Sequence, residues 1–434
     1  MMRMARKSVK SAFKILFVGG IISTGLIHAQ QKSFEVLPPT QLLDVRSVGN
    51  QQIQALIGKV HMVQPSPTGN VTIWCDSALR NLQTNVVQLF GHVRIVRDSV
   101  SLTSAYGLYF GDERRAEMPN GVRLTRGRMV LTSDRGRYWA NEKRAEFYGS
   151  VHAIDSTSST LSDSLTYFEN EEKSISVGNV SIFSPENNLT VFGDSVLHYE
   201  KRKYTVVPRK PKLMQVDTTS SGVIDTLVVT GSFMEAFQDT SSYFIARGRV
   251  EMARTDFAAR CGDAVYFLKG DRVILRNKPV VWHAENQLTG DSIVVRTNDR
   301  KLERVLVYGH AFAVSRVDSV HRLRYNQLSA RAITMHFQNG KIVGIDADRT
   351  ATSLYYLFDG VEPNGVNRSS GDRILMEFVG GKIDRIKIVG GVEGKYFPER
   401  MIMNHEHEYN LDGFSWIPDR PKRKQLRLVY DSYE

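Results

Sequence analysis

A recurring aspartate is the feature of this sequence that most resembles a chemical site. It follows a small residue, and apolar residues tend to come two and four positions later, in Ser133-Asp134, Ser162-Asp163, Gly262-Asp263, Gly290-Asp291 and Gly371-Asp372. Evenly spaced carboxylates could form a ladder of metal-binding or catalytic groups. A calcium site, however, draws several carboxylates from one short loop, and these aspartates stand far apart. We therefore interpret them as structural groups that accept hydrogen bonds at the start of a strand, where the backbone bends.

Other reactive side chains are few and scattered. His405-Glu-His407 could present two imidazoles on one face of an extended segment, but it lacks the helical His-Glu-x-x-His spacing of zinc proteases and is interpreted as a solvated tail. Cys75 and Cys261 stand at or beside the small-residue position, so packing explains them. The sequence contains no Gly-x-Ser-x-Gly elbow and no phosphate-binding loop. It predicts no catalytic residue, no metal site and no cofactor, and therefore no enzyme.

Composition narrows the class of protein further. The chain has 434 residues, of which 41% are hydrophobic, so we expect a folded protein rather than a disordered one. Two cysteines are too few for a disulfide scaffold. The 57 lysines and arginines are interspersed with 46 acidic residues. Dispersed charge of this kind argues against a nucleic-acid partner, whereas the mild excess of basic residues suits a partner that carries phosphates or carboxylates.

The N-terminus predicts export. Five basic residues precede an apolar run from Ile15 to Ile27, and Ala29 offers a small residue for cleavage. This order of regions is typical of a secretory signal peptide, here residues 1–29. The run is shorter than the roughly 18 residues of a membrane-spanning helix, so we favour a cleaved signal over a retained anchor.

A second marker recurs with a period of 29 residues. Gly-x-Val, followed two positions later by another apolar residue, starts at positions 91, 149 and 178, and Asn replaces the glycine at position 120. Further copies begin at Gly58, Gly248, Lys278 and Gly309. Because this marker keeps phase with the aspartate, we expect a chain built from repeated structural units.

Within a unit, apolar residues alternate with polar ones. Val93 and Ile95 share one face and the residues between them are polar, a period of two that is typical of a half-buried strand. Each unit would hold two strands, for example Leu89–Arg97 and Val100–Phe110. A unit of this kind buries its apolar face by stacking on its neighbours. The sequence thus predicts an elongated all-β body, either a jelly roll or a solenoid, with an unpaired strand at each end.

The 29-residue repeat is interrupted between Gly178 and Gly248, where the sequence contains Pro208-Arg-Lys-Pro211 and a polar stretch. We expect a long loop or a seam between two stacked blocks there. The predicted organisation is a signal peptide at 1–29, a first block at 30–205, a loop or seam at 206–225, a second block at 226–398 and an irregular tail at 399–434.

The ordered succession of these markers over residues 50–395 resembles the OstA-like family, the jelly rolls of lipopolysaccharide transport first named for organic-solvent tolerance. Gly371-Asp372-Arg-Ile-Leu-Met-Glu-Phe378 and Gly390-Gly-Val-Glu-Gly-Lys-Tyr-Phe-Pro398 add to the likeness. The tail Leu411-Asp-Gly-Phe-Ser-Trp416 resembles the end of longer members. The resemblance implies a repeat-built β-jelly roll, or β-taco, with two OstA-like blocks.

The same resemblance implies a non-enzymatic periplasmic protein, associated with the outer membrane, that shields lipid A acyl chains in a hydrophobic trough. Its implied partners are lipopolysaccharide, other jelly-roll transport proteins that pair through edge strands, and further copies of itself joined end to end. No nucleic acid is expected. Carried over by position, the candidate lipid-binding residues are Val93, Ile95, Val122, Leu124, Val151, Val180, Ile182, Val250, Met252, Val280 and Trp282.

Other classes of function stay open at this point. Alternating strands of about ten residues also occur in outer-membrane β-barrels. Stacked repeats also occur in exported β-helices that degrade or adhere to polysaccharide. The inner row of apolar residues would equally suit a dry, packed core with no ligand.

Overall fold

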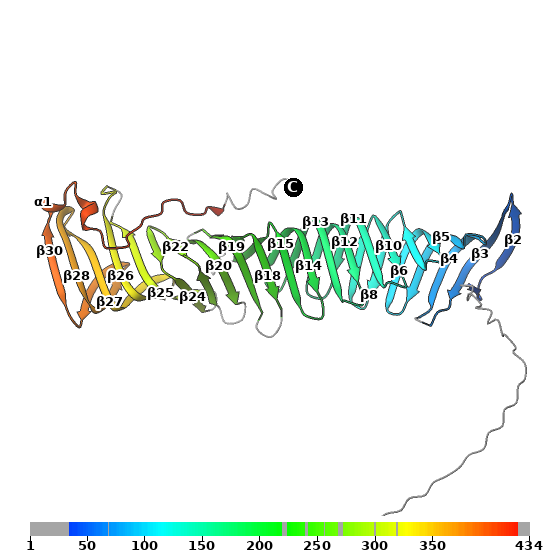
Figure 1. Ribbon diagram of the computed structural model, residues 1–434, viewed down its shortest axis with the longest axis horizontal. Helices are drawn as coiled ribbons and strands as arrows, with labels where there is room; N and C mark the ends of the chain where they lie inside the picture. Colours follow the sequence, from blue (N-terminus) through cyan, green and yellow to red (C-terminus); the bar gives the residue numbers. More distant parts are fainter. Residues whose placement is uncertain are drawn as a thin grey trace, which may run out of the picture.

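The computed structural model describes residues 34–423, except for residues 68, 219–223, 239–241, 256, 268–271, 299–300 and 318–319. The expected signal peptide at 1–29 lies outside the described residues. The described chain forms a long rod of β-strands (Figure 1). Antiparallel pairings join thirty strands into one continuous sheet, so the predicted elongated all-β class is confirmed.

The strands follow one another along the rod in nearly the order of the sequence. The first part holds β1 Glu35–Val36, β2 Leu42–Val48, β3 Gln51–Gln64, β4 Val71–Asn81, β5 Val86–Arg97, β6 Val100–Phe110, β7 Arg115–Met118, β8 Val122–Arg126, β9 Met129–Ser133, β10 Arg135–Trp139, β11 Arg144–Ile154 and β12 Ser159–Phe168. The middle holds β13 Lys173–Ser184, β14 Leu189–Tyr199, β15 Tyr204–Arg209, β16 Lys212–Thr218, β17 Ile224–Thr230, β18 Phe233–Phe237, β19 Tyr243–Ala253, β20 Phe257–Phe267 and β21 Arg272–Arg276. The last part holds β22 Val280–His283, β23 Asn286–Thr289, β24 Ser292–Asn298, β25 Lys301–Arg316, β26 Tyr325–Gln338, β27 Lys341–Asp359, β28 Glu362–Val379, β29 Lys382–Val389 and β30 Glu393–Pro398.

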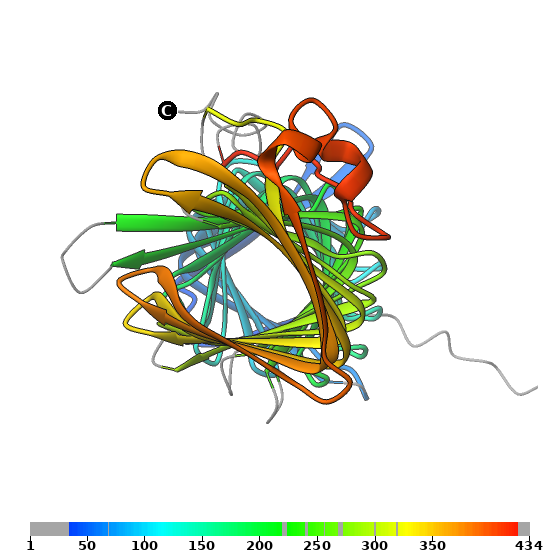
Figure 2. The ribbon, with the colours of Figure 1, turned by 90° about the vertical axis from the view of Figure 1, so that its left-hand side faces the viewer.

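Many strands bend at their middle, so the sheet folds into two walls. In β5 the pairing register shifts between Phe90 and Val93, and the two residues at the bend, Gly91 and His92, have positive φ angles of 67° and 43°. We call the wall that contains residues 86–90 the lower wall and the wall that contains residues 93–97 the upper wall. Viewed along the rod, the walls join along one side and part along the other, which we call the mouth (Figure 2).

An aspartate of the neighbouring strand fills the space beside the bend glycine. A Cβ atom at Gly91 would lie 2.1 Å from Asp76 Oδ2, and that oxygen lies 2.8 Å from His92 Nδ1. The same contact pairs Gly149 with Asp134, Gly178 with Asp163, Gly309 with Asp291 and Gly390 with Asp372. The two markers of the sequence are therefore two halves of one corner. The structural interpretation of the aspartate is confirmed, although the residue sits at a mid-strand bend rather than at the start of a strand.

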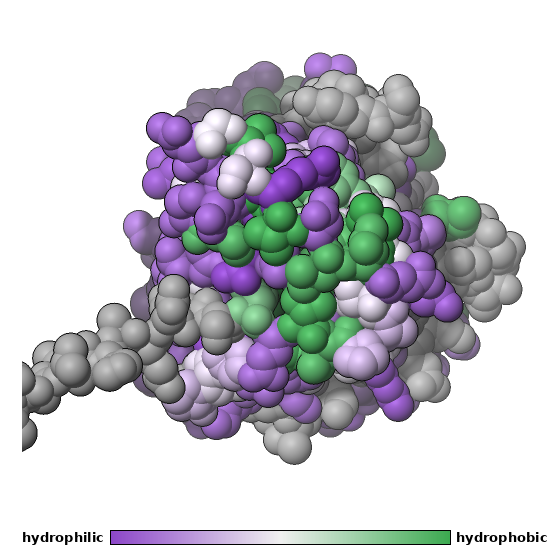
Figure 3. Space-filling model, turned by 90° about the vertical axis from the view of Figure 1, so that its right-hand side faces the viewer, coloured by the Kyte–Doolittle hydropathy of each residue, from purple (hydrophilic) through white to green (hydrophobic). Residues whose placement is uncertain are grey.

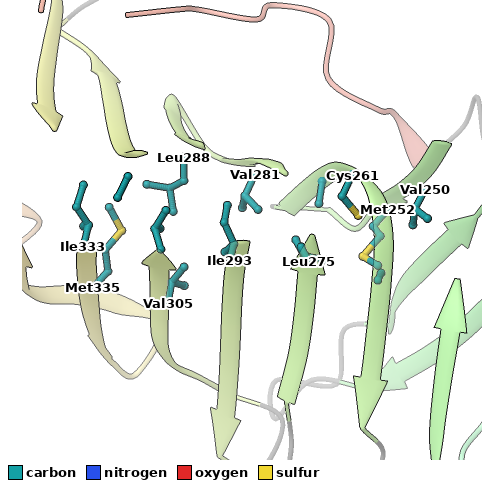
Figure 4. Close-up of a cluster of buried hydrophobic side chains, with 14 of the residues drawn as sticks. Val250, Met252, Cys261, Leu275, Val281, Leu288, Ile293, Val305, Ile333 and Met335 are labelled. Carbon is teal, nitrogen blue, oxygen red and sulfur yellow. The ribbon is translucent and has the colours of Figure 1, made fainter. Parts of the chain in front are cut away.

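Apolar side chains of the two walls meet inside the rod in two clusters. The N-terminal core is drawn from residues 34–167 and the C-terminal core from residues 180–376. Figure 4 shows part of the C-terminal core, where Val281 and Leu288 of the upper wall face Ile293 and Val305 of the lower wall. Each core also buries a free cysteine, Cys75 or Cys261, and burial raises the pKa of each thiol to about 12.

The stretch at 206–225, expected as a loop or seam, contains strands instead. Most of β15, the whole of β16 and the start of β17 lie in it and continue the sheet. Lys210, with φ 46°, stands near the bend where other copies have glycine, and its Nζ lies 3.1 Å from Asp194 Oδ2. The repeat could not be recognised in this part of the sequence, because the bend lacks the glycine that marks it in other copies. The division of the chain into two blocks stays a prediction.

The chain after β30 returns along the outer face of the upper wall (Figure 1). It forms α1 Glu399–Ile402 and the 3-10 turn η1 Glu406–Tyr409, followed by irregular backbone. Buried Gln287 holds this tail through both ends of its amide, because its Nε2 donates to Ser415 O at 2.6 Å and its Oε1 accepts from Ile417 N at 2.8 Å. The described residues include no helix long and apolar enough to cross a bilayer.

Candidate functional site: the space between the walls

Most of the predicted trough residues face the interior. Those in the N-terminal core are Val93, Ile95, Val122, Leu124 and Val151. Those in the C-terminal core are Val180, Val250 and Met252, and Ile182 packs against this core half-buried. Alternation with a period of two was a sufficient signal for these nine positions. Contact of these residues with a lipid stays a prediction.

Val280 and Trp282 were assigned to the wrong face. They form a separate cluster with Ala258, and the tail residue Ile417 packs against it. Trp282 Nε1 donates to Ile417 O at 3.0 Å, whereas the intervening Val281 lies in the C-terminal core.

The error has a physical cause in the position of the bend. The positive φ angles fall at Asn277 and Lys278, 62° and 57°, so the bend begins one residue before the Lys278 that had been aligned with glycine. A slip of one residue in a strand exchanges its two faces. The bend has no glycine in the sequence to mark it.

Polar bridges cross the mouth over the N-terminal core. Gln64, at the end of β3 in the upper wall, donates from Nε2 to Gly111 O in a lower-wall turn at 2.8 Å. In the opposite direction, Arg114 Nη2 donates to Gly69 O at 2.9 Å. A third bridge runs from Arg97 Nη1 in the upper wall to Ala140 O in the lower wall.

Tyr109 completes this group, because its hydroxyl donates to Gln64 Oε1 at 2.6 Å. Gln64, Arg97, Tyr109 and Arg114 are all at most 4% exposed, and we call these four residues the clasp. Burial raises the pKa of Tyr109 to about 12, so its hydroxyl stays protonated and able to donate at neutral pH. The clasp ties the two walls together through buried hydrogen bonds, which are costly to leave unmade.

Tyrosines occupy the mouth-facing position of the lower wall in this region. We call the second residue from the mouth end of a lower-wall strand the rim position. Tyr109, Tyr138 and Tyr167 hold it in β6, β10 and β12, and all three are buried. The Tyr138 hydroxyl donates to Glu169 Oε1 at 2.8 Å and the Tyr167 hydroxyl to Glu200 Oε2 at 3.3 Å. Only the Tyr109 contact crosses the mouth, because Glu169 and Glu200 lie in lower-wall turns.

The rim of the C-terminal core is different in chemistry and in exposure. Most of its side chains are apolar and half-buried and pack against the core, although Tyr266 of β20 and Thr297 of β24 also hold the rim position. The residues of this apolar rim are Phe244, Val273, Leu302, Phe337, Ile342, Phe378 and Ile383. The alternating pattern alone did not distinguish these positions from the rest of the lining.

A small cavity lies between the walls at this rim. Its volume is about 40 Å³, and its lining includes Leu227 and Met252 of the upper wall with Phe244, Tyr266 and Val273 of the lower wall. The space is large enough for a water molecule but too small for an acyl chain. An acyl chain that enters this cavity must therefore part the two walls.

Charge on the lower-wall turns also changes along the rod. Glu113, Glu142 and Glu171 lie in the turns beside the N-terminal core and pair with neighbouring cations, as Glu113 does with Arg115 at 2.7 Å. The hydrogen bond from Arg115 lowers the pKa of Glu113. The turn between β14 and β15 instead exposes the basic run 201–203, Lys-Arg-Lys. An anionic group would therefore be favoured beside this turn.

Both ends of the rod present edge strands. At the N-terminal end β2 pairs with β3, and all seven of its residues are exposed. Leu42, Leu43, Val45 and Val48 are 49–60% exposed and form part of a hydrophobic patch on this end face (Figure 3). At the other end β29 and β30 both pair with β28. The prediction of an unpaired edge at each end is confirmed in the described residues.

The remaining sequence candidates do not assemble a site. His405 and His407 are exposed, and Glu406, between them, pairs with the buried Arg324, whose Nη2 lies 3.3 Å from Glu406 Oε1. Within the described residues, no group of three or more histidine, cysteine, aspartate or glutamate side chains is placed to hold a metal ion.

Comparison with known proteins assigns the first part of the chain to a class. Residues 38–192, a little more than a third of the chain, match the family model of the OstA-like protein. The resemblance to the OstA-like family is confirmed over these residues.

Among solved structures, the chain is similar to LptH, described as the LptA homologous periplasmic component of the conserved lipopolysaccharide transport device from Pseudomonas aeruginosa. The match has 14% sequence identity and a TM-score of 0.25, and it covers 33% of this chain and 95% of that chain. A search of curated proteins gave no match.

Proposed function

We propose that this chain is a non-enzymatic lipopolysaccharide-binding transport protein of the periplasm that shields lipid A acyl chains between its two walls on their way to the outer membrane. The observation that carries the proposal is an apolar interior running through both cores, bordered in its C-terminal part by a half-exposed apolar rim. The match of residues 38–192 to the OstA-like family supports it.

The energetics favour the interior over surface charge as the source of affinity. Burying one methylene group contributes roughly 0.8 kcal/mol, so a twelve-carbon chain offers about 9 kcal/mol before the cost of parting the walls. An exposed ion pair between a lysine and a phosphate contributes about 0–1 kcal/mol. The interior would hold the lipid, and the basic turn 201–203 would orient its anionic headgroup.

Transport also requires neighbours, and the two ends of the rod are suited to them. An edge strand carries unpaired backbone groups that can pair with a strand of another protein. We include in the proposal that β2 and the β29–β30 edge join other jelly-roll transport proteins or further copies of this chain. Photocrosslinkers at Val45 of β2 and Tyr396 of β30, with exposed Arg94 as the control position, would identify such partners.

Bound lipid is the decisive measurement. The mature protein purified from its host, examined by native mass spectrometry, is expected to carry lipopolysaccharide or to take up added lipid A. Val273→Asp should reduce uptake because it places a carboxylate on the apolar rim, whereas the outward-facing Arg94→Asp should leave it unchanged. A protein that is lipid-free and takes up no lipid A would overturn the proposal.

A further inference from the structure

The two cores of the rod differ in how they are closed at the mouth. The N-terminal core is spanned at its mouth by the clasp, and its rim positions carry buried tyrosines. The C-terminal core has a mostly apolar, half-buried rim and an apolar cavity between its walls. We infer that acyl chains rest against the C-terminal core, and that the clasp keeps the region of the N-terminal core closed to them unless it opens. This inference rests on the proposed function.

The first argument is the cost of entry on each side. An acyl chain in the N-terminal part would separate Gln64 from Gly111 O and Tyr109 from Gln64. Those groups are buried, and an alkyl chain offers no hydrogen bond in exchange. At the C-terminal rim the chain would replace water beside Phe244, Val273 and their neighbours, and that exchange is favourable.

The second argument is the restraint on the walls. A cavity of about 40 Å³ must widen to admit an acyl chain. The clasp fixes the spacing of the walls over the N-terminal core, because Gln64, Arg97 and Arg114 all reach backbone carbonyls of the opposite wall or its turns. Widening on that side would break several buried contacts together, whereas the cavity side is lined by apolar groups that can repack.

The third argument is charge around the mouth. Glutamates at 113, 142 and 171 border the N-terminal mouth, and the basic run 201–203 marks the start of the C-terminal mouth. The glutamates are paired with neighbouring cations, whereas the basic run is exposed, so the anionic headgroup of a lipid is favoured beside the basic run. The occupant is thus an anionic lipid with acyl chains, held with its headgroup outside the apolar rim.

The test places the photoreactive residue p-benzoylphenylalanine at Phe244 or Phe337 in the apolar rim, and at Met129 as the matched control. Met129 packs half-buried against the N-terminal core, so it is as accessible as the rim without belonging to the clasp. With purified lipid A as the probe, adducts at Phe244 and Phe337 are expected to exceed those at Met129 by at least about tenfold, the ratio given by roughly two buried methylene groups.

Opening the clasp sharpens the test. Gln64→Leu removes the contacts to Gly111 and Tyr109, and adducts at Met129 should then rise while those at Phe244 stay unchanged. If this variant does not fold, as judged by circular dichroism, the comparison in the parent protein decides alone. Equal adducts at Met129 and Phe244 in the parent would overturn the inference and leave the proposed function standing. Absence of lipid A binding in native mass spectrometry would overturn both.

Discussion

The N-terminal and C-terminal cores are built by the same corner but closed by different chemistry. In both, an aspartate sits against a bend glycine, as Asp76 does at Gly91 and Asp291 does at Gly309. At the mouth the two regions diverge, because Tyr109 is 1% exposed and hydrogen-bonded whereas Phe337 is half-buried. The corner determines the shape of the rod, and the rim position is where the two regions differ.

The largest effect is expected where a charge enters a sealed core. Val93 is 1% exposed, so Val93→Asp buries an unpaired carboxylate and should lower the free energy of unfolding by about 4 kcal/mol or more. Val273→Asp, on the half-buried rim, should cost less than half as much because the carboxylate can reach water. Urea denaturation of both variants measures the difference. Similar losses would contradict the distinction between a sealed and an accessible region.

Replacing a bend glycine should destabilise the protein equally in the two regions. Alanine at Gly91 or Gly309 would place a Cβ 2.0–2.1 Å from an aspartate oxygen at positive φ, at an expected cost of about 2–3 kcal/mol. Gly340 also has positive φ, 75°, but has open space around it, so Gly340→Ala should cost about 1 kcal/mol. Thermal unfolding of the three variants tests this. A cost at Gly91 no greater than at Gly340 would show that the aspartate contact is not what demands glycine.

Changing one hydroxyl group at the rim position should affect stability differently in the two regions. Tyr109→Phe leaves the buried Gln64 without its hydrogen-bond donor and should destabilise the protein by about 1–2 kcal/mol. The reverse change, Phe337→Tyr, adds a hydroxyl near solvent and should alter stability by less than about 0.5 kcal/mol. Paired chemical denaturation curves provide the measurement. Equal effects would mean that the rim of the C-terminal core is as closed as the clasp.

The smallest effect is expected at the junction of the two regions. His198 holds the rim position of β14, and burial lowers the pKa of its imidazole below the ordinary value. The unfolded chain therefore binds the proton more readily, and stability should fall as pH drops from about 6.5 through the folded pKa. His198→Gln should flatten the pH dependence in that window. Unfolding curves at several pH values would reveal it, and an unchanged slope would contradict the assignment.

The sequence predicted the architecture well because its signals were local. Alternation placed Val93 and Val250 inside, and the paired glycine and aspartate marked most of the bends. The prediction was wrong where a bend is made by a residue other than glycine. Lys210 concealed strands in the expected seam, and Asn277 shifted the assigned faces of Val280 and Trp282.

The clasp and the tail could not be read from the sequence because they depend on distant pairs. Gln64 and Gly111 stand 47 residues apart, and Trp282 and Ile417 stand 135 apart. The residues near Gln64 in the sequence do not indicate whether its side chain spans the mouth or is simply a polar residue at the end of a strand. Similarly, the sequence pattern placed Trp282 on the inner face. The structure shows that it lies on the outer face, where the returning tail buries it.

The corner has a consequence for the length of the rod. Each aspartate–glycine contact joins two adjacent strands and depends on nothing farther along the rod. Neighbouring strands lie about 4.8 Å apart, so a unit of two strands adds about 10 Å to the axis. Whole units can be gained or lost while the angle between the walls is kept, and the distance that such a protein spans can therefore evolve in fixed increments, independently of what lies between its walls.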